Sequence, residues 1–73
     1  DRLIAETHVG EACVSTVFLG LDHSHRDGAP VLFETIVFGG PLNGQTIRSE
    51  TRAEAVAGHA AMVIRVKRVG GEP

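Results

Sequence analysis

Two apolar segments dominate the pattern of hydrophobic and polar positions along the chain. Residues 14–21 and 31–38 are rich in Val, Ile, Phe and Thr, which pack well on a pleated sheet, and both segments are bounded by Gly or Pro. One polar stretch, residues 22–30 (DHSHRDGAP), separates them. The pattern therefore predicts an antiparallel hairpin that holds most of the large apolar side chains.

Shorter segments on either side complete the predicted sheet. Residues 2–9 alternate loosely and predict an edge strand, which a turn at residues 10–11 connects to a second strand over residues 12–21. Residues 39–44 (GGPLNG) are dense in turn formers, and their Asn-Gly pair tolerates positive φ in tight turns. Residues 45–49 then predict a fourth strand.

The period of the pattern changes at Thr51, where a capping box is expected. The Thr51 hydroxyl can accept from the backbone N–H of Glu54, and the Glu54 carboxylate can reach back to the start of the helix. Helical spacing of apolar residues predicts a helix over residues 52–69, ended by a left-handed glycine cap at residues 70–71. The predicted buried face consists of Ala53, Val56, Ala57, Ala60, Val63 and Ile64. The predicted opposite face consists of Glu54, Gly58, Ala61, Arg65 and Arg68.

These elements predict an α+β fold: a small antiparallel sheet of about four strands with one C-terminal helix packed on one face (β-β-β-β-α). No repeat or linker interrupts the pattern, so residues 1–73 are expected to form a single domain.

A domain of this size buries only about 60% of the surface of its unfolded chain, so a disulfide, a metal or a partner is expected to add stability. Cys13 is the only cysteine, which excludes a disulfide within one chain.

Both faces of the predicted central hairpin are apolar, whereas a sheet with one solvated face should alternate. In the first segment, one face carries Val14, Thr16 and Phe18, and the other carries Val17, Leu19 and Leu21. In the second segment, Val31, Phe33 and Val37 oppose Leu32, Ile36 and Phe38. One helix covers only one face. The other is expected to be covered by a second copy of the chain, in a homodimer or small ring, or to be buried by curvature of the sheet into a half-barrel.

Charge and composition argue against two classes of partner. The net charge is −2, and the aromatic residues are three Phe with no Trp or Tyr, so nucleic-acid binding is not expected. The one basic cluster, Arg65, Lys67 and Arg68, falls at the C-terminal end of the predicted helix, where cations interact favourably with the helix dipole. No apolar run approaches the roughly 18 residues that span a bilayer, and no signal peptide is recognisable, so we expect no membrane partner and a cytoplasmic location.

The polar hairpin loop contains the most recognisable candidate ligands, His23 and His25. Alternate residues of an extended segment point the same way, so the two imidazoles could converge on a metal, with Asp22 or Asp27 beside them. The pair lacks a third fixed ligand, and the other interpretation is a polar loop whose Asp and Ser side chains satisfy backbone groups of the turn. We therefore predict no metal and no cofactor, and keep His23 and His25 as the alternative metal site.

Two further polar residues interrupt apolar elements. Glu34 lies within an apolar strand and is expected to pair with Arg48 on the neighbouring strand, a histidine or a ligand being the other options. His59 follows Gly58, and glycine in mid-helix often marks close packing or the approach of a ligand. His59 also lies between the predicted apolar and polar faces, so we interpret it as a boundary histidine rather than a catalytic base. No serine or cysteine belongs to a recognisable nucleophile motif, which argues against a hydrolase.

Three stretches carry a resemblance to a known family: residues 14–23 (VSTVFLGLDH), 32–40 (LFETIVFGG) and 54–59 (EAVAGH). Over residues 14–66 the chain resembles a family of small uncharacterised proteins encoded by tailed bacteriophages, prophages and some bacteria. The resemblance implies a phage or mobile-element setting in a bacterial cell, and it implies no activity or catalytic residue. His23, Glu34 and His59 are the polar positions that match, whereas the loop from His25 departs from the shorter or Gly-rich loop expected in the family.

The sequence thus favours a non-enzymatic, phage-type accessory module that self-associates and binds a host protein, a phage protein or a small ligand through its hairpin loop and sheet. The expected binding residues are His23, Glu34, His59 and Asp22, and no catalytic residue is assigned. The alternative is a metal- or histidine-dependent, enzyme-like site built from His23, His25 and Glu34, which predicts a pocket where His23, Glu34 and His59 converge. A second alternative is a minor structural component of a virion.

Overall fold

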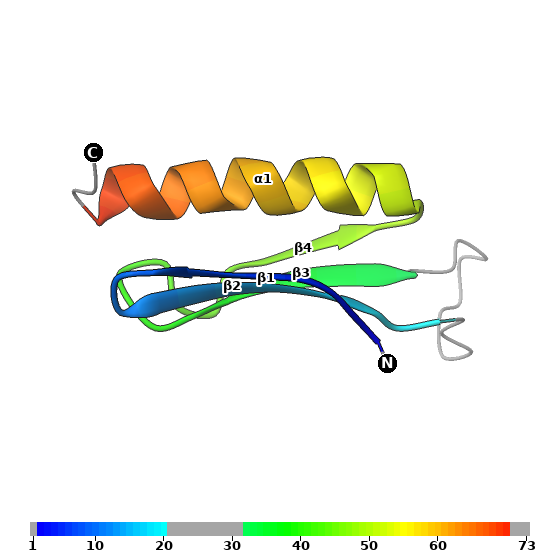
Figure 1. The fold of residues 1–73 in the computed structure, drawn as a ribbon, viewed down its shortest axis with the longest axis horizontal. Coiled ribbons are helices and arrows are strands. Elements are labelled where there is room, and N and C mark those ends of the chain that lie inside the picture. Colours follow the sequence, from blue (N-terminus) through cyan, green and yellow to red (C-terminus); the bar gives the residue numbers. More distant parts are fainter. Residues whose placement is uncertain (1, 21–31, 71–73) are drawn as a thin grey trace.

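A computed structural model describes residues 2–20 and 32–70 of the chain. Within them, four strands and one helix follow one another in the predicted order (Figure 1). Their bounds are Leu3–Val9 for β1, Ala12–Phe18 for β2, Phe33–Phe38 for β3, Thr46–Ser49 for β4 and Arg52–Val69 for α1. The helix has the bounds that its periodicity predicts. The strands β2 and β3 are shorter than the apolar segments that predict them.

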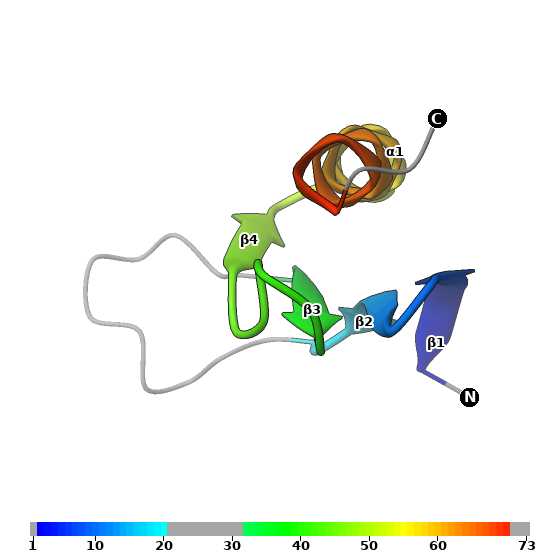
Figure 2. The ribbon, with the colours of Figure 1, turned by 90° about the vertical axis from the view of Figure 1, so that its left-hand side faces the viewer.

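The four strands form one open antiparallel sheet in the order β1-β2-β3-β4. The helix α1 lies along one face of this sheet, and no other element of the described chain covers the opposite face (Figures 1 and 2). Val14 pairs with Val37 across β2 and β3, so the two apolar segments are antiparallel neighbours as predicted. The predicted α+β fold with a C-terminal helix on one face is confirmed.

The side chains of β2 and β3 alternate between the two faces of the sheet. Val14, Thr16, Thr35 and Val37 lie on the face under α1 and are at most 1% exposed. The intervening residues point to the opposite face and are half-buried or exposed. The predicted division of these strands into two faces is therefore confirmed, and the face under α1 has threonines at its centre.

The three phenylalanines are also divided between the two faces of the sheet. Phe33 is buried, and the ring of Phe18 packs against it at 5.3 Å between centroids. Phe38 lies on the face opposite α1 and is 53% exposed. The aromatic residue on the uncovered face is thus Phe38.

The hydrophobic core between sheet and helix is built from small and medium-sized side chains. Its buried members are Val9, Ala12, Val14, Val37, Met62 and Val66. Leu42, Ile47 and Val63 pack around them and are partly buried. Met62 is the largest fully buried side chain, so the core depends on close packing of many small groups.

The start of α1 follows from its first residues. The Thr51 side chain accepts a hydrogen bond from the Glu54 backbone N–H at 3.1 Å, and the Glu54 carboxylate accepts from the backbone N–H of Thr51 at 3.3 Å. This is the predicted capping box, which satisfies donors that the first turn of a helix leaves unpaired. At the C-terminal end of α1, Gly70 has φ −79° and is right-handed, and Gly71, the other residue of the predicted left-handed cap, lies outside the described residues.

The predicted buried face of the helix is wrong. The buried residues are Ala55, His59, Met62 and Val66, whereas Val56 and Ile64 are each 52% exposed. The observed face is offset by one residue, or about 100° around the helix axis. Alanines and valines surround most of the helix, so the apolar pattern is weak, and the polar groups of the sheet decide which side packs inward.

Gly39 allows the β3–β4 turn to lie close to the β1–β2 turn. Its φ is +82°, and a Cβ at this position would lie 2.5 Å from the carbonyl oxygen of Glu11. The Asn43 side chain accepts a hydrogen bond from the Gly39 N–H at 2.7 Å and closes the turn. In the Asn-Gly pair, the positive φ is at Gly44, at +91°.

The observed helix face predicts unequal effects of two truncations. Replacement of Met62, which is 1% exposed, by alanine should lower the free energy of unfolding by about 2–5 kcal/mol, because it leaves a cavity between helix and sheet. Ile64→Ala, on the face that the pattern alone would bury, should change it by about 0.5 kcal/mol or less. Urea unfolding of the two variants measures both effects. A larger loss at Ile64 than at Met62 would contradict the helix orientation.

Candidate functional site

The face of the sheet opposite α1 carries the side chains most accessible to a ligand or partner. We call it the open face and define it, from β1 to β4, by Leu3, Glu6, His8, Cys13, Ser15, Val17, Glu34, Ile36, Phe38, Thr46 and Arg48. It combines exposed apolar residues with ionisable ones. The ionisable residues gather in two places, over β1 and β2 and over β3 and β4.

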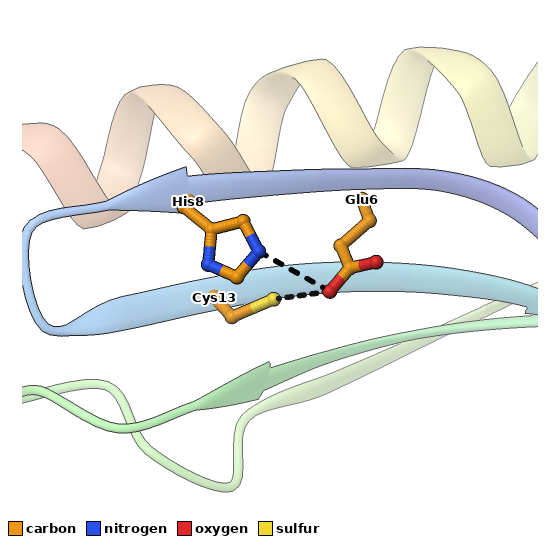
Figure 3. Close-up of side chains that lie close together, drawn as sticks. All are labelled: Glu6, His8 and Cys13. Carbon is orange, nitrogen blue, oxygen red and sulfur yellow. Dashed lines mark hydrogen bonds and ion pairs between the residues drawn. The ribbon is translucent and has the colours of Figure 1, made fainter.

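Three potential metal ligands, Glu6, His8 and Cys13, meet on the β1–β2 hairpin (Figure 3). Glu6 and His8 are two residues apart on β1 and so share a face, and the turn at residues 10–11 places Cys13 directly opposite His8. The Glu6 carboxylate Oε2 lies 3.3 Å from His8 Nε2 and accepts a hydrogen bond from Cys13 Sγ at 3.4 Å. The carboxylate thus bridges the imidazole and the thiol. We call these three residues the β1–β2 cluster.

The surroundings of Cys13 keep its thiol protonated. Burial raises the pKa of the thiol, and the hydrogen bond to Glu6 and the negative charge of that carboxylate raise it further. The thiolate is the nucleophilic and metal-binding form of cysteine. This thiol therefore becomes a ligand only when a bound cation takes the place of its proton.

Glu34 forms the predicted ion pair with Arg48. The two residues face each other across β3 and β4, with Arg48 Nε donating to Glu34 Oε2 at 3.3 Å. The Arg48 side chain is exposed, so the pair is worth about 1 kcal/mol or less. This pairing explains how a carboxylate is accommodated within an apolar strand.

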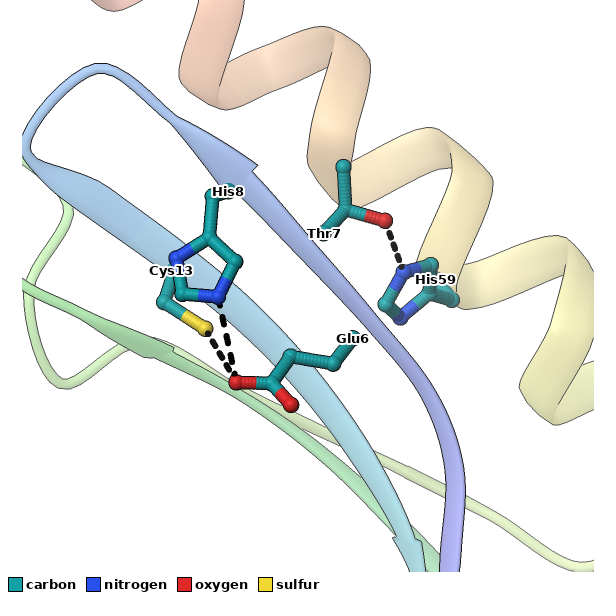
Figure 4. A network of polar contacts seen from close by, with 5 residues as sticks. All are labelled: Glu6, Thr7, His8, Cys13 and His59. Carbon is teal, nitrogen blue, oxygen red and sulfur yellow. Dashed lines mark hydrogen bonds and ion pairs between the residues drawn. The ribbon is translucent and has the colours of Figure 1, made fainter.

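The imidazole of His59 lies between α1 and the sheet. Its Nε2 is hydrogen-bonded to Thr7 Oγ1 at 2.9 Å and its Nδ1 to Thr16 Oγ1 at 2.8 Å. Thr16 Oγ1 is in turn 2.6 Å from Thr35 Oγ1. Figure 4 shows the ring of His59 on the helix side of β1, opposite the β1–β2 cluster. Throughout the described residues, every buried side-chain nitrogen or oxygen has a hydrogen-bond partner.

Desolvation by burial lowers the pKa of His59. The neutral ring is satisfied in either tautomer, because each ring nitrogen faces a hydroxyl that can donate or accept. The unfolded chain binds this proton more readily than the folded one. The stabilising contribution of His59 is therefore complete above its ordinary pKa of 6.5 and decreases as the pH falls below that value. The interpretation of His59 as a boundary residue is wrong, because the residue is only 7% exposed.

The residues that the sequence assigned to one binding site are not brought together in the described chain. Glu34 lies on the open face, and His59 lies on the other side of the sheet under α1. Asp22, His23 and His25 lie outside the described residues. Glu34 and His59 therefore do not share a pocket.

Neither the β1–β2 cluster nor the hydrogen-bond network of His59 is predicted by the apolar and polar pattern of the sequence. Part of the β1–β2 cluster could have been predicted from the sequence, because a turn at residues 10–11 between two strands already places His8 opposite Cys13. No signal in the sequence identifies the threonines that bind His59. They come from two different strands, and their contact with the helix depends on how α1 is rotated.

One hollow of about 350 Å³ opens where the last turn of α1 meets the β1–β2 and β3–β4 turns. Its side-chain lining is largely apolar, with Val9, Ala12, Val66 and Val69. Among the described residues, Glu11 is the one ionisable side chain that lines it. The hollow therefore brings together no acid–base pair.

Comparisons with known proteins leave the function to be argued from this geometry. No family model, no curated protein and no solved structure matches the chain. In the described part of the chain, no helix is both long and apolar enough to cross a bilayer.

The His59 network predicts a strong energetic coupling between helix and sheet. Thr16→Val keeps the side-chain shape but leaves His59 Nδ1 and the Thr35 hydroxyl without their partner, and should lower the free energy of unfolding by about 1–3 kcal/mol. His59→Leu should be similarly destabilising. The double variant should lose clearly less than the sum of the two, because both sides of the contact are then apolar.

Urea unfolding of the four proteins in this cycle gives the coupling energy. Thr46→Val is the matched control and should change stability by about 0.5 kcal/mol or less, because the Thr46 hydroxyl is exposed and water can replace it as the donor to the Gly44 carbonyl oxygen. Strict additivity of Thr16→Val and His59→Leu would show that the hydrogen bond does not join helix and sheet.

Proposed function

We propose that the protein is a non-enzymatic binding module that self-associates, with a second copy of the chain seated on its open face. The observation that carries the proposal is the apolar surface of that face. Leu3 and Phe38 are 43% and 53% exposed, and Val17 and Ile36 are half-buried. A solvated sheet face is normally polar, so this surface is expected to be removed from water by a partner.

The apolar residues form a diagonal band, with Ser15 and Glu34 on either side of it. Leu3 pairs with Val17 across β1 and β2, and Ile36 and Phe38 follow along β3. Val17 and Ile36 occupy neighbouring diagonal positions, which side chains on one face of a sheet can bridge. The band therefore crosses the open face from the start of β1 to the end of β3.

The open, four-stranded sheet allows a second copy of the chain to lie on the open face. A two-fold axis parallel to the strands places β1 of one copy over β4 of the other. By the register of the strands, Leu3 of one copy then lies over Arg48 of the other and Glu6 lies over Thr46, so no like charges meet between the two edges. One patch serves both copies, as a two-fold interface requires.

The chemistry of the described residues supports binding rather than catalysis. The Cys13 thiol donates to a carboxylate that raises its pKa, whereas an activated cysteine needs a lowered pKa. His59 is buried with both ring nitrogens hydrogen-bonded, and Glu34 is ion-paired. These groups are engaged in structural contacts.

The resemblance to phage-encoded proteins suggests the setting of this module. In our proposal it acts in a bacterial host cell as a phage-type accessory protein and offers the loop of residues 22–30 to a host or phage protein. That loop lies outside the described residues.

Self-association predicts that the purified protein sediments above the monomer mass at about micromolar concentration. Ile36→Lys buries a charge in the proposed interface and should weaken association at least about tenfold. Ile64→Lys, at a 52% exposed position on the outer side of α1, is the matched control and should leave the mass unchanged. Sedimentation equilibrium measures all three proteins.

Three results would contradict the proposal. They are a monomeric unmodified protein across the concentration range, association of Ile36→Lys with unchanged strength, and dissociation by Ile64→Lys. Circular dichroism of each variant checks that the fold is retained.

A further inference from the structure

The β1–β2 cluster comes close to the spacing of a tetrahedral metal site. The ligand atoms of Glu6, His8 and Cys13 all lie within 4.8 Å of one another, and the carboxylate oxygen is 3.3 Å from the imidazole nitrogen and 3.4 Å from the sulfur. Around a tetrahedral ion with bonds of about 2.0–2.3 Å, neighbouring ligand atoms are about 3.3–3.8 Å apart. Small side-chain rotations are therefore enough to surround an ion.

We propose that Glu6, His8 and Cys13 bind a zinc-class divalent ion through carboxylate oxygen, imidazole nitrogen and thiolate sulfur. Thiolate and imidazole ligands favour zinc and its first-row neighbours over magnesium and calcium, which prefer oxygen ligands alone. In the single chain the three side chains lie on the open face, so the fourth position of a tetrahedral ion is accessible to water or to a ligand.

The backbone holds the three ligands in place before any ion binds. His8 and Cys13 are paired across the β1–β2 ladder, which continues through Thr7 and Val14. Thr7 lies between Glu6 and His8, and its hydroxyl is hydrogen-bonded to His59 behind the sheet. The strand that supplies two ligands is thus attached to α1 at the residue between them (Figure 4).

Binding exchanges a proton for the ion. The Cys13 thiol loses the proton that it donates to Glu6, a sulfur–metal bond forms, and one proton passes to solvent. The Glu6 carboxylate is released from that hydrogen bond and becomes free to bind the ion. The thiol–carboxylate contact of the metal-free protein is replaced in full, so no buried polar group loses its partner.

The test is a titration of the full chain with Co²⁺, after removal of metal by chelation and in a non-thiol reductant. One Co²⁺ per chain should bind with sulfur-to-cobalt charge-transfer absorption and the intense visible bands of a tetrahedral site, and Zn²⁺ should displace it. Cys13→Ser, His8→Gln and Glu6→Gln should each weaken binding at least about tenfold. Glu34→Gln, a carboxylate elsewhere on the open face, is the matched control and should bind as the unmodified protein does.

A second measurement needs no variant. Cys13 is the only cysteine, so the rate of alkylation by iodoacetamide reports on it alone, and Zn²⁺ should slow that rate at least about tenfold. Absence of the sulfur-to-cobalt absorption, or unchanged alkylation in saturating Zn²⁺, would overturn the proposal. Binding that survives Cys13→Ser but is lost in His23→Gln would overturn it as well, by moving the ion to the loop.

The metal site and the proposed self-association are separate proposals, and the experiments can contradict either one without the other. Metal binding is measured per chain, and a stoichiometry of one ion per two chains would contradict a site built within one chain. Ile36→Lys, designed to disrupt the interface, should still bind one Co²⁺ per chain, since Ile36 pairs with Ser15 and Thr46 rather than with a ligand.

Discussion

The buried hydrogen bonds of His59 are the constraint on which the rest of this small fold depends. One imidazole joins α1 to Thr7 of β1 and Thr16 of β2, and the Thr16 hydroxyl extends the contact to Thr35 of β3. A buried polar group without a partner costs about 1–3 kcal/mol, which is more than one formed hydrogen bond contributes. Any rotation or shift of the helix that separates ring and hydroxyls is therefore penalised. Small aliphatic side chains alone would discriminate weakly between helix faces.

The same network accounts for the unusual distribution of polarity between the two sides of the sheet. Threonines occupy the centre of the face under α1, where they serve the imidazole, and part of the apolar surface lies on the open face instead, at Val17, Ile36 and Phe38. Burial of that surface is the physical basis of the proposed self-association. The ionisable residues of the open face occupy positions beside the apolar band, where Glu6 remains accessible to solvent or to an ion.

Local signals in the sequence were sufficient for the elements and their order. The β-branched segments, the turn residues around Gly39 and the Thr51–Glu54 capping box each act over a few residues, and each is found where it was predicted. The rotation of α1 was not predictable in this way, because it depends on contacts from two strands to the side chain of His59. The candidate site was predictable from the sequence only in part. The position of His8 opposite Cys13 follows from a predicted turn, whereas the approach of the Glu6 carboxylate to both depends on side-chain conformation.

The protonation of His59 is the most direct measure of whether its neutral, buried ring joins helix and sheet. Nitrogen and proton NMR of histidine-labelled protein follows the ring through a pH titration, with the urea-unfolded chain as the reference. The folded protein is predicted to hold a neutral His59 at neutral pH and to give a pKa below the ordinary value of 6.5, because burial disfavours the charged ring. A pKa at or above 6.5 in the folded protein would mean that the ring is solvated or charged, and would contradict the account.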